Sequence, residues 1–152
     1  ISYDRIGNVA VKQGKLDKAR ASYEQGLAIR RQLVLSGPGN AGWHRDLTVS
    51  YNSVGDVAVK QGNLDEARLN YEKALVIAQQ LASSDPGNTV WQRDFAISLW
   101  KLASLDASGY DWRRVHAQLQ SMKTEGILAY ADEGLLSLAA RNAEQERSKE
   151  VR

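Results

Sequence analysis

The residue types that most often carry catalysis or bind metals form no recognisable site in this sequence. The chain has two histidines, His44 and His116, and no cysteine. Neither histidine is accompanied by acidic residues at the spacing of metal ligands, and no serine lies in a nucleophile-elbow motif. The lack of cysteine excludes thiolate catalysis, cysteine-ligated zinc and disulfide bonds. We therefore predict no catalytic residue, no metal site and no cofactor, and a protein that is not an enzyme.

Two glycine-rich segments are the other candidates for ligand chemistry. Residues 36–40 read Ser-Gly-Pro-Gly-Asn, and residues 84–88 read Ser-Asp-Pro-Gly-Asn. A phosphate-binding loop follows a strand and carries a lysine, and neither feature is present in these segments. Proline and glycine favour turns, so we interpret both segments as connectors between helices.

The two connectors belong to a sequence repeat that dominates the chain. Residues 2–46 recur as residues 50–94, at a constant offset of 48 residues. A third and more degraded copy follows, in which Ser98 corresponds to Ser50. A fixed period of this length is typical of a stacked repeat, in which each unit packs against its neighbours.

Each unit is predicted to contain a pair of helices, because its apolar residues recur at three- and four-residue steps. In the first unit, Ile6, Val9 and Ala10 share one face. Gly14 marks the end of that helix, and Asp17 opens the next one with a carboxylate at its amino end. No segment alternates as a strand does, so we expect no sheet.

We predict a single domain over residues 1–152 that contains three units and a capping helix. We predict helices over residues 1 to about 13, 16–36, from near residue 43 to 61, 64–84, and from near residue 90 or 91 to near residue 107. A turn at residues 108–110 leads to a shorter helix, which Asp111 caps and which ends before Gly126. The units lie at about residues 1–36, 43–84 and 91–123, and the capping helix at about residues 131–147. The polar residues 145–152 are expected to fray.

The spacing within each unit resembles the tetratricopeptide repeat over roughly residues 1–122. The matching positions of the second unit are Tyr51, Val54, Gly55, Ala58, Ala67, Tyr71 and Ala74, and those of the first are Tyr3, Ile6, Gly7, Ala10, Ala19, Tyr23 and Gly26. The resemblance implies an all-α fold, a right-handed α-solenoid of three helical hairpins with a C-terminal capping helix. Because the period exceeds the usual 34 residues or so, the chain is most similar to long-repeat arrays of bacterial type.

Mid-helix glycines support this packing independently. A glycine inside a helix costs about 1 kcal/mol relative to alanine, so Gly7 and Gly55 need a compensating contact. Helices that cross at short distance require small residues at the crossing. We therefore expect Gly55 to face Ala67, with Tyr71 filling the space beside it.

The resemblance also implies that the first helices of successive units line a concave groove that holds a peptide or a partner protein. Carried over position by position, the groove residues are Asp4, Asn8, Lys12, Asn52, Asp56, Lys60, Trp100 and Ser104. Asp4 and Ile97 stand where a carboxylate clamp would place lysines, so we predict no such clamp. The alternative interpretation, that these residues form a merely solvated helix face, stays open.

Trp43 and Trp91 allow two interpretations. They could be exposed anchors for a partner, or each could cover the second helix of the preceding unit. We favour the second, because burying an aromatic side chain removes about 150–250 Å² from water. The adjacent pairs Arg45–Asp46 and Arg93–Asp94 also allow two interpretations, a recognition pair for a partner or a charge pair near a helix end. We favour the charge pair, again a structural role.

The bulk properties fit a protein-binding module. A formal charge of +2 is too balanced to argue for nucleic acid or an anionic membrane, and no apolar run is long enough for a membrane span. The chain begins at Ile1 inside a repeat, so we interpret it as part of a longer protein. We predict a non-catalytic, cytoplasmic interaction or scaffolding module for a protein or peptide. The alternative is a structural spacer or oligomerisation segment of a larger multidomain regulatory protein.

Overall fold

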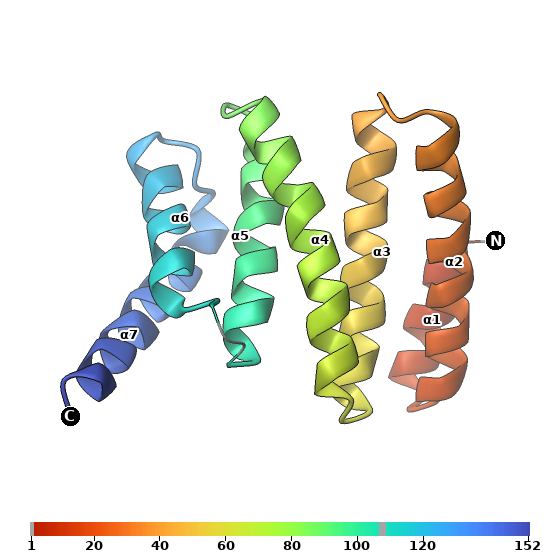
Figure 1. Cartoon of the computed structure of the whole chain (residues 1–152), viewed down its shortest axis with the longest axis horizontal. Helices are drawn as coiled ribbons and strands as arrows, with labels where there is room; N and C mark the ends of the chain where they lie inside the picture. Colours follow the sequence, from red (N-terminus) through yellow and green to blue (C-terminus); the bar gives the residue numbers. More distant parts are fainter. Residues whose placement is uncertain (1, 107–108) are drawn as a thin grey trace. The chain divides into compact units, whose positions relative to one another are not determined.

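The computed structural model describes residues 2–106 and 109–152, and the regular structure in these ranges is entirely helical (Figure 1). The absence of strands there agrees with the all-α fold expected from the sequence. The helices are α1 (Tyr3–Lys12), α2 (Leu16–Ser36), α3 (Ala41–Lys60), α4 (Leu64–Ser84), α5 (Thr89–Ser104), α6 (Trp112–Thr124), the short 3-10 helix η1 (Tyr130–Asp132) and α7 (Glu133–Glu150).

The second helices of the first two repeats are equivalent, as the period predicts. Helices α2 and α4 each contain 21 residues and begin at Leu16 and Leu64. The turns before them share one geometry, because Gly14 and Gly62 adopt φ angles of 71° and 78°. After α3, the Asn63 amide donates to the Ala58 carbonyl at 2.8 Å and the Gly62 amide to Val59 at 3.0 Å. These bonds form a Schellman motif, which needs a left-handed residue at the glycine.

The first helices of the second and third repeats begin one or two residues earlier than predicted. The side chain of Asn40 accepts a hydrogen bond from the Trp43 amide at 3.0 Å. Asn88 does the same for Trp91 at 3.1 Å. Asparagine is a favoured N-cap because its oxygen satisfies an otherwise unpaired amide. The starts predicted near residue 43 and near residue 90 or 91 were therefore slightly late, since Asn40 and Asn88, the last residues of the connectors, are the caps.

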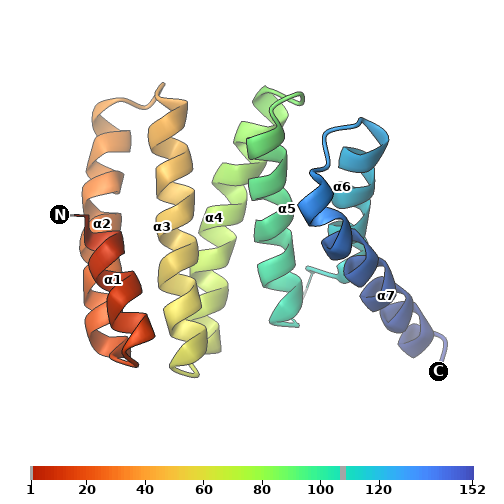
Figure 2. The same cartoon turned by 180° about the vertical axis from the view of Figure 1, so that it is seen from behind.

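The described chain divides within α4 into two compact units, residues 1–77 and 78–152, and each is described by itself. In the first, α1 and α3 lie on one face, and α2 lies with the start of α4 on the opposite face (Figures 1 and 2). Two clusters of buried residues form part of its core. The first holds Ala10, Ala19, Tyr23, Val54 and Val57, and the second holds Leu47, Tyr51 and Ala74.

Two glycine–tyrosine contacts set the packing of the first unit. A Cβ atom added to Gly7 would lie 2.4 Å from Cε1 of Tyr23, and one added to Gly55 would lie 2.4 Å from Cε1 of Tyr71. Real Cβ atoms do not approach other atoms so closely, so each tyrosine ring occupies the place of the missing side chain. Tyr71 fills the space beside Gly55 as predicted, but the residue expected to face Gly55, Ala67, supplies none of the three atoms nearest to the added Cβ. The first repeat has the same arrangement, with Tyr23 against Gly7.

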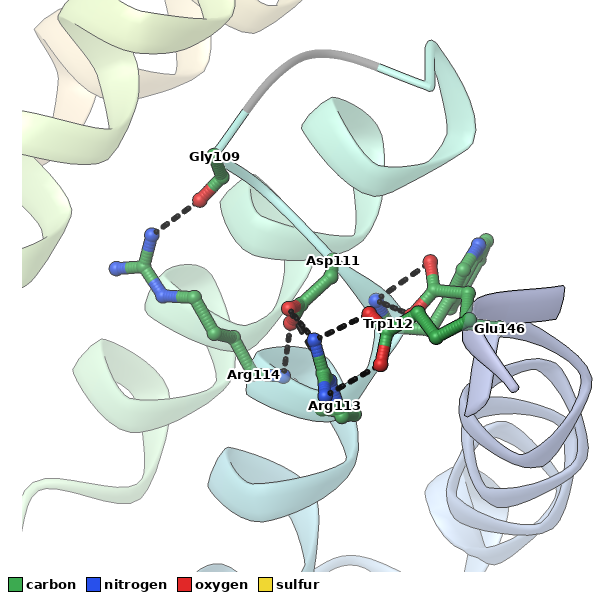
Figure 3. Close-up of polar contacts among 7 residues, drawn as sticks. Gly109, Asp111, Trp112, Arg113, Arg114 and Glu146 are labelled. Carbon is green, nitrogen blue, oxygen red and sulfur yellow. Dashed lines mark hydrogen bonds and ion pairs between the residues drawn. The ribbon is translucent and has the colours of Figure 1, made fainter. Parts of the chain in front are cut away.

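In the second unit, α7 closes the amino end of α6 (Figure 3). Asp111 caps α6 by accepting from the Arg114 amide at 3.1 Å, as predicted. The Glu146 carboxylate of α7 accepts from the Trp112 amide at 2.9 and 3.1 Å. Glu150 pairs with Arg113 at 3.0 Å.

These contacts correct the predicted end of the chain. Residues 145–152 were expected to fray, whereas α7 continues to Glu150 because its last two turns carry the acidic side chains that bind α6. Helix α5, the first helix of the third repeat, ends at Ser104 rather than near residue 107. Residue 107, and residue 108 of the predicted turn, lie outside the described residues.

Candidate functional site

Six of the eight predicted groove residues lie in the first unit, on two helices that share a face (Figure 2). Helix α1 carries Asp4, Asn8 and Lys12, and α3 carries Asn52, Asp56 and Lys60. The other two, Trp100 and Ser104, belong to α5 in the second unit. Below, "the first-helix strip" means the six residues of the first unit.

Asp4 is engaged within the unit. Its carboxylate receives both amino groups of Arg30 from α2: Nη1 donates to Oδ1 at 3.0 Å, and Nη2 forms an ion pair with Oδ2. Nη1 also donates to the hydroxyl of Ser50 on α3 at 2.5 Å. The hydrogen bond to Asp4 raises the pKa of Arg30, although burial opposes this increase. Arg30 therefore links three helices, a role that no local pattern around it indicates.

Asn8 and Asp56 occupy the same position of successive repeats, and each binds the tyrosine of its own hairpin. The Tyr23 hydroxyl donates to Oδ1 of Asn8 at 2.6 Å, and the Tyr71 hydroxyl donates to Oδ1 of Asp56 at 2.6 Å. Burial is the main cause of the raised pKa of Tyr71, and the bond to Asp56 adds to it. Tyr23 of α2 and Tyr71 of α4 thus fix the side chains of Asn8 and Asp56 in the first-helix strip.

The remaining members of the strip differ in exposure. Lys12 and Lys60 are exposed in the last turns of α1 and α3, where a positive charge suits the helix dipole. Asn52 is half-buried, and its Oδ1 has no hydrogen-bond partner among the described residues. The strip therefore offers two cations and an amide to a ligand, while the acid at Asp4 is already neutralised.

Trp100 of α5 lines an apolar cavity of about 190 Å³, which we call the Trp100 cavity. Its ring meets Trp112 edge to face, with centroids 4.8 Å apart and planes at 87°, so its orientation is fixed. The hydroxyl of Ser104 donates to the Trp100 carbonyl at 2.8 Å, within the helix, and is not among the lining residues. The cavity is lined by Arg93, Ala96, Ile97, Trp100, Lys101, Leu119, Asp132 and Leu135.

One edge of the Trp100 cavity is an ion pair between α5 and η1. Nε of Arg93 donates to Oδ2 of Asp132 at 2.7 Å, and Nη2 donates to Oδ1 at 3.1 Å. The Asp132 side chain is only 7% exposed, whereas that of Arg93 is 47% exposed. The hydrogen bond to Asp132 raises the pKa of Arg93, so the guanidinium stays charged. The sequence placed Asp132 only near the start of a helix, so this pair was missed.

Trp43 and His44, in the first turn of α3, have structural partners in the first connector. Trp43 lies against Gly37, where an added Cβ would come within 2.4 Å of its Cζ3. Nε2 of His44 lies 2.7 Å from the Pro38 carbonyl oxygen, to which it can donate. Both rings therefore pack on the connector. Among the described residues, no group of three or more histidine or acidic side chains could hold a metal ion.

The comparison with known families decides what kind of repeat this is. The family model of the tetratricopeptide repeat matches residues 1–36 and 47–86, which together make up half of the chain. The chain belongs to the tetratricopeptide repeat family. It has no significant match among curated proteins or solved structures. The matched residues contain Gly7 with Tyr23 and Gly55 with Tyr71, so both glycine–tyrosine contacts of the structure lie within the family match.

Membership of the tetratricopeptide repeat family indicates a general role. Its repeats generally mediate protein–protein interactions and are typically non-catalytic. No helix within the described residues is both long enough and apolar enough to cross a membrane. The second unit lies mostly outside the family match, and the Trp100 cavity is part of it.

Proposed function

We propose that this chain is a non-catalytic interaction module that binds a peptide or a partner protein along its first helices. The contact residues would be the first-helix strip, together with Trp100 and Ser104 in the groove expected for the family. The observation that carries this proposal is that Tyr23 and Tyr71 hold Asn8 and Asp56 on the shared face of α1 and α3. Side chains fixed before binding lose less entropy when a ligand arrives.

The composition of the strip favours a polypeptide ligand over other classes. Exposed lysines and amides can bond a peptide backbone and its acidic side chains, and aromatic side chains anchor interfaces. The formal charge of +2 supplies no field of the kind that attracts nucleic acid or anionic lipid. We place the protein in the cytoplasm and propose no cofactor.

The proposal is tested by capturing a partner, producing it pure and measuring its affinity for four forms of the chain by calorimetry. Truncating a central aromatic anchor often costs 2 kcal/mol or more, so Trp100→Ala should weaken binding by roughly thirtyfold. Lys60→Ala should weaken it less, and mainly at low salt, because exposed charges act mostly through steering. Gln25→Ala, on the exposed surface of α2, is the matched control.

Loss of binding in Gln25→Ala, with full affinity in Trp100→Ala and Lys60→Ala, would place the partner on the second helices and refute the proposal. Self-association of the isolated chain that is abolished by Lys60→Ala would instead support the alternative role in oligomerisation. Sedimentation velocity over a range of concentrations distinguishes these results.

A further inference from the structure

The Trp100 cavity has the size and chemistry of a pocket for one apolar side chain. A cavity of about 150 Å³ lined by apolar residues is large enough for benzene, and this one measures about 190 Å³. Five of its eight lining residues are apolar: Ala96, Ile97, Trp100, Leu119 and Leu135. A leucine or phenylalanine side chain would therefore fill it and leave little empty space.

The charges on the cavity favour an acidic neighbour for that side chain. Two basic residues and one acidic residue line it, and the acid, Asp132, is already bonded to Arg93 through two oxygens. Asp132 engages Nε and Nη2, so Nη1 is the nitrogen of Arg93 that a ligand can engage. Asp94 also acts on Arg93 electrostatically, but it does not line the cavity.

A cationic ligand fits this edge poorly. It would have to compete with Arg93 for a carboxylate that is 7% exposed. Breaking a buried ion pair leaves an uncompensated charge and is strongly unfavourable. A carboxylate, by contrast, can add to the exposed side of Arg93 without disturbing Asp132, because guanidinium groups present several donors.

We propose that the Trp100 cavity binds one leucine- or phenylalanine-sized side chain of an internal peptide segment of a partner protein, with an aspartate or glutamate beside it that bonds Arg93. This inference rests on the proposed function and specifies the chemistry of the ligand at the third repeat. Trp100 forms a wall that Trp112 holds in place, and Arg93 provides the polar contact that sets the register of the peptide.

Blocked dipeptides test the cavity without knowledge of the natural partner. The probes are N-acetyl-Glu-Phe-amide, N-acetyl-Lys-Phe-amide and N-acetyl-Glu-Ala-amide, all uncharged at their ends, titrated into the whole ¹⁵N-labelled chain. The chain has four tryptophans, so Trp100 gives one of four indole N–H signals. The Glu-Phe probe should shift the Trp100 signal in a saturable way, and the Glu-Ala probe should not. The Glu-Phe probe should bind about two to five times more tightly than the Lys-Phe probe, which is the range expected for an exposed ion pair.

Variants that fill the cavity provide the second arm. Ile97→Phe from α5 and Leu135→Phe from α7 each add volume to a half-buried lining position, so either should abolish the Glu-Phe shift. Val49→Phe is the matched control, because Val49 holds the same position of the preceding repeat and is 41% exposed. Two independent filling variants keep the test decisive if one of them does not fold.

Failure of this inference is distinguishable from failure of the proposed function. If no probe shifts Trp100, if the Lys-Phe probe binds as well as Glu-Phe, or if folded Ile97→Phe and Leu135→Phe keep the shift, the cavity proposal is overturned. A partner that binds through Lys12 and Lys60 would still support the proposed function in each case. A partner that binds only the outer surface of α2 would refute the proposed function and, with it, this inference.

Discussion

Position 30 shows how much one side chain can change a repeat. Arg30 binds Asp4 and Ser50, and so ties α2 to two first helices. One period later the corresponding residue is Ala78, which is 1% exposed, and the hydroxyl of Ser98 (equivalent to Ser50) has no partner among the described residues. The polar network of the first repeat is therefore replaced by apolar packing in the next, although α2 and α4 have the same length.

The glycine–tyrosine contact predicts opposite effects for two glycine-to-alanine changes. Gly55→Ala should destabilise the chain by about 1–3 kcal/mol, because the new methyl group would displace the Tyr71 ring from a packed core. Gly134→Ala, in α7, should stabilise it by up to about 1 kcal/mol, because no atom lies within 4 Å of the added Cβ and alanine favours helix. Urea unfolding measures both. Equal effects of the two changes would mean that the Tyr71 ring moves aside without cost.

The buried hydroxyl of Tyr71 predicts a loss of stability in alkali. Burial and the bond to Asp56 raise the pKa of Tyr71 above its ordinary value of 10. The unfolded chain therefore loses this proton at a lower pH than the folded chain does. The contribution of the neutral hydroxyl is complete below pH 10 and is lost as pH rises above it toward the folded pKa.

Tyr71→Phe removes the hydroxyl and provides the comparison for that prediction. The variant should be less stable than the parent at pH 7, since Asp56 loses a donor, and the difference should shrink between pH 10 and 12 or so. Unfolding free energies from urea titrations at each pH give the result. A difference that stays constant up to pH 12 would show that Tyr71 ionises as easily in the folded chain as in the unfolded one.

At the scale of the element, the sequence predicted best what local chemistry decides. The bounds of α2 and α4 were predicted correctly, because each helix has a clear signal at both ends. Gly14 and Gly62 mark the turn before each helix, and a proline lies in the connector that follows it. The starts of α3 and α5 were missed by one or two residues, because the capping roles of Asn40 and Asn88 were overlooked. The mid-helix position of Gly55 was enough to predict a close contact there, but the ring of Tyr71 takes the place that was assigned to Ala67.

Features that depend on long-range contacts were not predicted. The bonds from Tyr23 and Tyr71 to the first-helix strip join residues that are 15 apart, and the register of a hairpin must be known before they can be drawn. The pair of Arg93 and Asp132 spans 39 residues and joins α5 to a turn that the sequence placed only approximately. The Trp100 cavity depends on that pairing, so no local pattern indicated it.

The clamp of α7 on α6 is the clearest test at this scale. The Glu146 carboxylate accepts a hydrogen bond from the Trp112 amide at the positive end of α6. It therefore acts as an N-cap residue does, although it belongs to another helix. Glu146→Ala should therefore lower stability by about 0.5–2 kcal/mol, the usual effect of losing a cap. Gln145→Ala, at the exposed position next to it, is the control and should stay within about 0.5 kcal/mol. Thermal unfolding followed by circular dichroism compares them, and equal midpoints would show that α7 does not cap α6.

At the scale of the whole molecule, α4 is the element that both compact units share. It is one continuous helix from Leu64 to Ser84, and the division between the units falls after Ile77. The part within the second unit is only residues 78–84, in which Ala78 and Ala82 are buried and the Ala82 carbonyl accepts from Gln92 at 2.8 Å. Helices shorter than about 12–15 residues are marginal in water, so this end of α4 depends on the rest of the helix.

We therefore expect the two units to unfold together. Labelling with 5-fluorotryptophan gives four ¹⁹F signals from the four tryptophans, with Trp43 reporting on the first unit and Trp112 on the second. Both signals should disappear at the same urea concentration, because loss of the first unit frays α4, whose last residues carry the buried Ala78 and Ala82. Gly55→Ala, a change confined to the first unit, should lower both midpoints equally. If it lowers the midpoint of Trp43 and leaves that of Trp112 unchanged, α4 does not couple the units, and each is stable by itself.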